Sequence, residues 1–207
     1  GWGFFEPSLK YIEFMLDRGE TDRLETSVFF SQKGIDSLIA TTPYTAETLP
    51  SFVSPITRDG DENTSTVRSI FSSGKHYLPT NQLIPGRTAY GSNKNNIVFR
   101  YSETLLMYAE ALVQGANNSV MTADEAVNQV RARANMAPLS GVTLDQIVDE
   151  KYAELSMEWG KRFFDMVRLG RYDELSFDGR TFTEDRAFVT YHQDQIDEFP
   201  ILGEIAN

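Results

Sequence analysis

The second half of the chain carries apolar residues at the spacing of an α-helix. From residue 101 to residue 112 they fall on one stripe of a helix with about 3.6 residues per turn, so this stretch is predicted to be helical. Gly115 and the two asparagines that follow it closely are typical of a helix end. The predicted buried stripe consists of Tyr101, Leu105, Tyr108, Ala109 and Leu112.

A second helix is predicted to begin at Thr122, because Thr122 and Glu125 have the spacing of a capping box. With small residues Ala109 and Ala126 at facing positions, the two helices are typical of a tetratricopeptide pair. No second copy follows at the period of about 34 residues that such repeats show, so we expect the remaining repeats to be absent or to lie outside this chain. The predicted inner face of the second helix consists of Ala126, Val127, Val130 and Ala134, and Pro138 ends the segment.

A third helix is predicted from Thr143, which forms a capping box with Gln146, to about Gly170. Its apolar residues step by three or four positions and are expected to form one buried side, so Trp159 is predicted to lie in the core. Gly160 is unfavourable inside a helix and is expected to let a neighbouring backbone approach closely. The stripe consists of Val148, Tyr152, Leu155, Trp159, Phe163 and Met166.

The first 99 residues are richer in Gly, Pro, Ser, Thr and Asn and have few periodic runs. One short helix is predicted over residues 7–19 and a short strand over residues 26–30. A loop-rich segment as long as residues 41–96 is usually functional, or is held by contacts with another part of the protein. We therefore expect residues 1–99 to be the candidate ligand-binding segment and residues 100–207 to form a helical core with a C-terminal tail.

Composition indicates a soluble globular protein, with 41% hydrophobic and 24% charged residues among 207. The formal net charge of −11 disfavours nucleic acid as a partner and fits a neutral or basic ligand better than a strongly anionic one. The chain contains no cysteine, which excludes disulfides, thiolate metal sites and a cysteine nucleophile. It shows neither a signal peptide nor an apolar run that approaches the roughly 18 residues of a membrane helix.

Searches for catalytic motifs find no nucleophile elbow, zinc-protease helix or phosphate-binding loop, and only two histidines. Glu154 and Glu158 share a predicted helix face, and paired carboxylates can hydrolyse glycosides. Acids and bases at helical spacing more often form structural ion pairs, so we assign a structural network and no catalytic residues. The acidic loop at residues 59–63 is interpreted as solvated, with calcium as an open alternative and no other metal or cofactor expected. The predicted ion-pair network consists of Glu154, Glu158, Arg162, Asp165 and Arg168.

Four segments of the second half follow one another in the order and at the distances of a known family. They are Arg-Tyr-x-Glu at 100–103, Tyr-Ala-Glu-Ala at 108–111, Asn-x-Val-Arg-x-Arg-Ala at 128–134, and a Glu-Leu-rich segment ending in Asp-Met-x-Arg at 154–168. With Asp22 and Arg23 in an upstream turn and Phe-Pro-Ile-Leu-Gly-Glu-Ile near the end, the chain resembles the C-terminal portion of the SusD/RagB family, surface nutrient-binding lipoproteins of Bacteroidetes. It departs from the family pattern at Leu202, where proline is common, and at residues 150–152, where Glu-Arg-Arg is usual.

This resemblance implies a mostly α-helical, tetratricopeptide-related fold with long loop-rich excursions and little β structure over residues 1–207. It also implies non-catalytic binding of an oligosaccharide or polysaccharide at the cell surface and its delivery to a SusC-like TonB-dependent outer-membrane transporter. Family members are usually more than twice this length. We therefore expect the N-terminal half, with the signal peptide and the lipidated cysteine that would attach the protein to the outer membrane, to lie outside this chain.

Loop aromatics are the expected ligand contacts, because sugar rings stack on aromatic faces while polar side chains bond the hydroxyl groups. Trp2 is preferred, since it lies between glycines in a segment where the family places glycan-stacking aromatics. Alternatives are a peptide-binding importer subunit of the same family, a helical-repeat adaptor for proteins, or a glycosidase with two carboxylates about 5 to 10 Å apart in a cleft. The candidate ligand-binding residues are Trp2, Phe4, Tyr44, Tyr77, Asn81, Arg87 and Tyr90.

Overall fold

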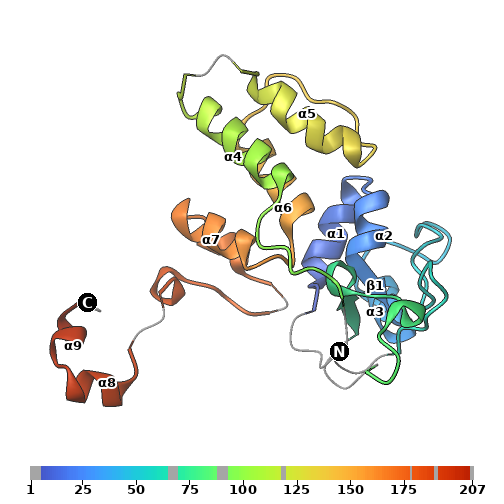
Figure 1. Cartoon of the computed structure of the whole chain (residues 1–207), viewed down its shortest axis with the longest axis horizontal. Helices are drawn as coiled ribbons and strands as arrows, with labels where there is room; N and C mark the ends of the chain where they lie inside the picture. The colour runs from blue at the N-terminus through green and yellow to red at the C-terminus, as the bar shows by residue number, and fades with distance from the viewer. Residues whose placement is uncertain are drawn as a thin grey trace. The chain divides into compact units, whose positions relative to one another are not determined.

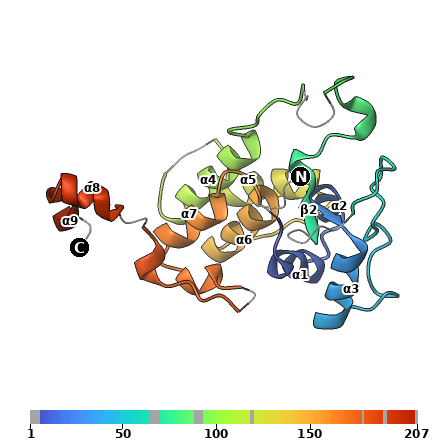
Figure 2. The ribbon, with the colours of Figure 1, turned by 90° about the horizontal axis from the view of Figure 1, so that it is seen from below.

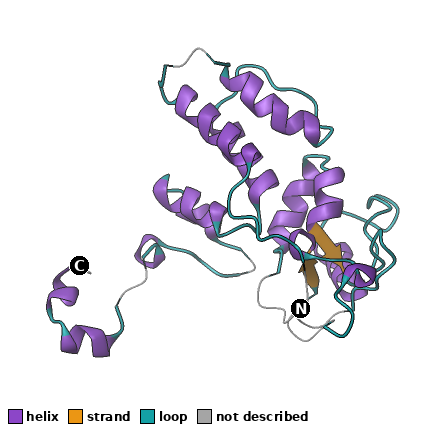
Figure 3. Ribbon diagram, in the orientation of Figure 1, coloured by secondary structure: helices purple, strands orange, loops and turns teal. Residues whose placement is uncertain are grey.

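The structure is a computed structural model in which helices outweigh strands (Figure 3). In the described part of the chain the strands are β1 (Val28–Phe30) and β2 (Phe71–Ser73), so the predicted mostly helical fold with little β structure is confirmed. Contacts divide the chain into two units, residues 1–162 and residues 163–207. The described residues are 6–64, 70–87, 93–117, 120–177, 179–188 and 191–205.

The first core of the larger unit is built from α1 (Leu9–Asp17), α2 (Asp22–Ser27), α3 (Gln32–Thr41) and the β1–β2 pair. Both the helix predicted over residues 7–19 and the strand predicted over residues 26–30 are found, although the helix begins after a Ser8 cap. The strands run antiparallel, with Phe30 opposite Phe71 and Val28 opposite Ser73.

The second core lies where α4 (Tyr101–Val113), α5 (Ala123–Arg133) and α6 (Leu144–Leu155) pack together (Figures 1 and 2). Both predicted capping boxes are present at the starts of α5 and α6. Helix α6 covers the apolar face of the α4–α5 pair through Ile147 and also reaches the first core through Ala153. The prediction was wrong for Tyr101, which is 67% exposed at the first turn of α4.

The third predicted helix does not run unbroken to residue 170. Helix α6 ends at Leu155, and α7 (Lys161–Arg168) begins after a turn. Met157, Trp159 and Gly160 have φ values of 63°, 49° and 68°, and this left-handed conformation cannot continue a right-handed helix. Trp159 is therefore 53% exposed instead of buried in the core, and its indole N–H donates to the Ile97 carbonyl at 2.6 Å. Gly160 serves the left-handed turn rather than a close approach inside a helix.

Short elements complete both units. In the larger unit the loop segment between α3 and α4 includes the 3₁₀ helices η1 (Gly74–His76) and η2 (Thr80–Gln82). The smaller unit contains most of α7, followed by η3 (Tyr172–Leu175), η4 (Glu184–Arg186), α8 (Gln193–Glu198) and α9 (Ile201–Ile205). Among the described residues, none of the helices combines the length and apolar character needed to cross a membrane.

The capping box of α5 supports a first prediction. The Glu125 amide N–H donates to the Thr122 hydroxyl at 3.1 Å, and the Thr122 N–H donates back to the Glu125 carboxylate at 2.7 Å. We expect Thr122→Ala to lower the free energy of unfolding by about 1 kcal/mol, because a helix-end donor loses its partner. Urea unfolding followed by circular dichroism measures this. Thr122→Ser keeps the hydroxyl and should restore most of the stability, and equal stability of Ala and wild type would contradict the prediction.

Candidate functional site

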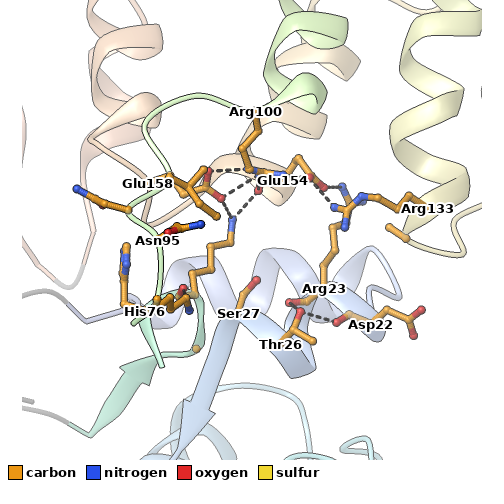
Figure 4. A pocket seen from close by; sticks show the side chains of 16 residues that line it. Asp22, Arg23, Thr26, Ser27, His76, Asn95, Arg100, Arg133, Glu154 and Glu158 are labelled. Atoms are coloured by element: carbon orange, nitrogen blue, oxygen red, sulfur yellow. Dashed lines mark hydrogen bonds and ion pairs between the residues drawn. The ribbon is translucent and has the colours of Figure 1, made fainter. Parts of the chain in front are cut away.

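A pocket of about 700 Å³ opens in the larger unit between α2, η1, the segment before α4 and the turn after α6 (Figure 4). Most of its lining residues are polar or charged, and helix α5 adds its last arginine and the alanine that follows. The lining residues are Asp22, Arg23, Thr26, Ser27, Gly74, Lys75, His76, Lys94, Asn95, Asn96, Ile97, Arg100, Arg133, Ala134, Glu154 and Glu158. We refer to this set as the charged pocket.

Two carboxylates of the charged pocket are held by basic residues from distant parts of the chain. The Arg100 guanidinium contacts Glu154 at 2.6 Å and Glu158 at 2.9 Å. Lys75 lies 2.6 Å from Glu158, and Arg133 lies 2.5 Å from Glu154. Burial favours the neutral form of both carboxyl groups, but the hydrogen bonds from Arg100 and the neighbouring positive charges outweigh it and hold both pKa values below their ordinary range.

These low pKa values bear on the glycosidase alternative. A glycosidase needs one carboxylic acid with a raised pKa to protonate the leaving oxygen. Glu154 and Glu158 are instead ionised and paired with the Arg100 guanidinium. Such ion pairs are suited to binding and to stabilising the structure rather than to proton transfer.

Behind the pocket, Glu150 is the centre of a buried cluster. Its carboxylate is 0% exposed and contacts Arg18 at 2.7 Å, Arg23 at 2.7 Å and Arg131 at 2.8 Å. Arg23 also contacts Glu20; burial lowers the pKa of Arg23, but the bonds to Glu20 and Glu150 raise it overall. These bonds tie α2, α5, α6 and the end of α1 together, so the wall of the pocket is fixed by charge as well as by packing.

The local charge of the pocket is opposite to that of the whole chain. Among its described lining residues, the basic side chains outnumber the acidic ones by two. The basic residues are Arg23, Lys75, Lys94, Arg100 and Arg133, and the acidic residues are Asp22, Glu154 and Glu158.

A second hollow of about 480 Å³ lies beside β1 and is lined by four aromatic residues, Phe29, Phe30, Phe52 and Tyr77. The Tyr77 ring meets the Phe29 ring edge to face at 4.4 Å, and its hydroxyl bonds Asp61. Burial, the hydrogen bond to Asp61 and the charge of Asp61 raise the Tyr77 pKa. The polar lining includes Ser51, Ser54, Thr57, Arg58, Asp59 and Gln82. We call this hollow the aromatic groove.

The aromatic groove and the charged pocket adjoin, because Thr26 and Gly74 line both. An added Cβ at Gly74 would lie 2.2 Å from the Thr26 carbonyl oxygen. Only a glycine allows the two main chains to approach this closely, and no side chain of residue 74 separates the two hollows.

Of the four sequence-predicted ligand residues that the structure describes, one lies in either of the two hollows. Tyr77 lines the aromatic groove, whereas Tyr44 bonds Asp17 at 2.6 Å and lines neither hollow. Asn81 and Arg87 are exposed and also lie outside both linings. Trp2, Phe4 and Tyr90 lie outside the described residues.

Sequence reasoning missed Phe29, although a signal for it was present. Side chains alternate between the two faces of a strand, so Phe29 must point away from its buried neighbours Val28 and Phe30. An aromatic side chain on the outer face of a short strand is positioned to line a groove beside that strand. Phe52 and Arg133 carried no comparable local signal.

The predicted ion-pair residues are distributed over both units. Glu154 and Glu158 belong to the charged pocket, where their partners are Arg100, Lys75 and Arg133. The predicted network member Arg162 stacks on the Tyr152 ring at 4.3 Å, within the larger unit. Asp165 and Arg168 form an ion pair of 2.6 Å within the smaller unit.

The acidic loop at residues 59–63 uses one of its carboxylates as an internal acceptor. Asp61 accepts bonds from the Tyr77 hydroxyl and from the Thr80 backbone N–H, which lies at 2.8 Å. These hydrogen bonds lower its pKa and join the loop to η2. No three acidic or histidine side chains gather as metal ligands among the residues that the structure describes.

Comparison with known proteins identifies structures of the same fold. Surface glycan-binding protein A from Bacteroides thetaiotaomicron is 25% identical with a TM-score of 0.65, over 96% of this chain and 40% of that one. The same protein in complex with laminarihexaose gives 25% identity and a TM-score of 0.66, again over 96% and 40%. Surface glycan-binding protein A from Bacteroides uniformis, at 21% identity and a TM-score of 0.67 over 97% and 40%, shares the fold.

Sequence comparison leads to the same group. A SusD-like protein of Bacteroides ovatus (strain ATCC 8483) is 36% identical over 81 residues, which cover 38% of this chain and 14% of that protein. The chain thus spans well under half the length of these relatives. The sequence model of the SusD family matches residues 1–199. On that match, which covers nearly the whole chain, the protein belongs to the SusD family.

Proposed function

We propose that the protein binds an oligosaccharide non-catalytically and that the aromatic groove holds part of this ligand. The observation that carries the proposal is the groove itself, in which the aromatic residues Phe29, Phe52 and Tyr77 lie beside hydroxyl, amide and charged side chains. This combination matches a sugar, whose C–H faces stack on aromatic rings while its hydroxyl groups form hydrogen bonds. A related structure of the same fold was solved in complex with laminarihexaose, which supports a glucan as the first ligand to test.

Membership of the SusD family supports a cellular location and a partner for the proposed glycan binding. We propose that the protein works at the surface of the outer membrane, where it passes the captured glycan to a SusC-like TonB-dependent transporter. We further propose that this chain is the C-terminal part of a longer domain, in which residues 1–99 contribute most of the ligand contacts and residues 100–207 the helical support. Attachment to the membrane would use a lipidated N-terminus.

The groove predicts a defined loss of glycan affinity in the full-length protein. We expect Phe29→Ala to weaken binding of the best glycan about tenfold, because one stacking face is removed, a loss of about 1.4 kcal/mol. Calorimetric titration against laminarihexaose and a panel of plant, microbial and host glycans measures this. Phe188→Ala removes an aromatic side chain that is 78% exposed in the smaller unit and should leave the affinity unchanged.

The possible results separate the alternatives. Unchanged glycan affinity of Phe29→Ala would remove the aromatic groove as the site and leave Trp2, tested by Trp2→Ala, as the stacking candidate. Failure of the wild type to bind any glycan would contradict the proposed function. A peptide panel would then distinguish a peptide importer from a protein adaptor.

A further inference from the structure

The charged pocket holds an excess of positive charge in an acidic protein. The chain carries a net charge of −11, yet basic side chains outnumber acidic ones among the described residues that line this pocket. A concave site lined by an excess of one charge focuses the electric field and attracts ligands of the opposite charge, here anions. The chain's own glutamates compensate only part of this charge.

Arg133 is the basic residue best placed to meet a ligand. Its side chain is 61% exposed, and it forms an ion pair with Glu154 at 2.5 Å through Nη2. This is the single bond of the Arg133 side chain within the described part of the chain, so the other N–H groups of the guanidinium remain available. A guanidinium fork donates two parallel bonds to a planar carboxylate, which a lysine cannot do.

The opposite side of the pocket offers polar groups for a sugar ring. Figure 4 shows Asn95 and His76 across the pocket from Arg133. Asn95 and Asn96 are exposed and form no hydrogen bonds within the described residues, so their amides can bond ring hydroxyls. Asp22, on the Arg133 side, supplies an acceptor for a hydroxyl group.

An anion in the charged pocket would also stabilise the charged forms of its two lysines, Lys75 and Lys94. Burial lowers the pKa of Lys75 although Glu158 opposes the effect, and burial lowers the pKa of Lys94. The Lys94 ammonium lies 2.6 Å from the Lys75 carbonyl oxygen and 3.0 Å from that of Tyr77, which places it at the junction of the pocket and the groove residue Tyr77. A nearby negative charge would favour the charged form of both lysines.

We propose that the charged pocket binds the carboxylate of an acidic sugar residue, such as a uronic acid, within the glycan held by the adjoining aromatic groove. The inference rests on the proposed glycan-binding function and adds the ligand class. Arg133 binds the carboxylate, Asn95 and Asn96 bind neighbouring hydroxyls, and the ligand continues past Thr26 and Gly74 into the groove. A glycan that contains uronic acid is thus preferred over a neutral one, contrary to what the net charge alone indicates.

The test compares acidic oligosaccharides with neutral twins of the same linkage. Oligogalacturonide, glucuronoxylan and alginate hexamers are titrated into the full-length protein, each beside a sample in which the carboxyl groups have been reduced to primary alcohols. We expect at least one acidic hexamer to bind tenfold or more tightly than its reduced twin, with an affinity that falls between 50 and 500 mM salt because the contact is electrostatic.

Variants then assign the preference to this pocket. Arg133→Gln should reduce the affinity for the acidic hexamer about tenfold while leaving the reduced twin unaffected, because only the carboxylate contact is lost. Lys33→Gln, which removes the same charge from an exposed position on α3, should change neither affinity. Asn95→Ala, an exposed loop change that disturbs no packing, should weaken both ligands several-fold.

Each outcome decides between the two proposals. The acidic-sugar pocket would be overturned if neutral and acidic hexamers bound equally, or if Arg133→Gln weakened both ligands to the same extent. Neither result would contradict the proposed glycan binding. Tighter binding of every reduced twin would overturn it as well. Absence of binding to all acidic and neutral glycans would overturn the proposed function and this inference together.

Discussion

Replacing Glu150 with glutamine is expected to lower the free energy of unfolding by about 3–5 kcal/mol. The glutamine keeps the shape of the side chain but removes the charge that compensates Arg18, Arg23 and Arg131. Glu150 is fully buried, so water cannot take over the lost interactions, and the cations remain desolvated without their counter-charge. Because these arginines come from α2, α5 and the end of α1, the loss affects the contact of all three with α6.

Urea unfolding of the full-length protein measures this effect, with circular dichroism as the probe. Glu47→Gln is the matched control, because Glu47 is exposed and its carboxylate accepts a bond from the neighbouring Thr45 hydroxyl. We expect this control to leave the stability unchanged, because surface substitutions without buried partners have little effect. A loss below about 1 kcal/mol for Glu150→Gln would show that packing alone holds the four segments together.

Replacing Gly74 with alanine is expected to cost about 2–3 kcal/mol of stability and to weaken glycan binding. The new Cβ would lie 2.2 Å from the Thr26 carbonyl oxygen and 2.9 Å from its carbonyl carbon. Both are main-chain atoms of α2, so relief requires α2 and η1 to move apart. Since residue 74 lines both hollows, such a movement also alters a wall of each.

Gly60→Ala separates this steric effect from the cost of backbone conformation. Gly60 has a φ of 90° with open space around the position of a Cβ, so alanine there should cost only about 1 kcal/mol. Thermal unfolding and glycan titration of both variants provide the comparison. Equal stability losses for the two variants would refute the close approach of the main chains at residue 74.

Local signals determined much of the helical core. The capping boxes at Thr122 and Thr143, and the apolar stripe of α4 apart from Tyr101, depend on residues only a few positions apart, so the sequence alone predicted them correctly. The helix period continues through residues 155–160, and no local rule indicated the break there. Left-handed backbone at Met157 and Trp159 costs about 1–2 kcal/mol per residue. Tertiary bonds, from Trp159 to Ile97 and from Glu158 to Lys75, offset that cost.

The candidate site shows the same division between local and tertiary information. The sequence by itself established the family resemblance, the loop-rich first half and Tyr77 as an aromatic worth testing. It could not pair Glu154 with Arg100 or join Thr26 to Gly74, because these residues are far apart along the chain and their contacts form only on folding. The positive pocket in an acidic chain was likewise decided by the tertiary structure, since net charge is a sum over all residues whereas a pocket selects a few of them.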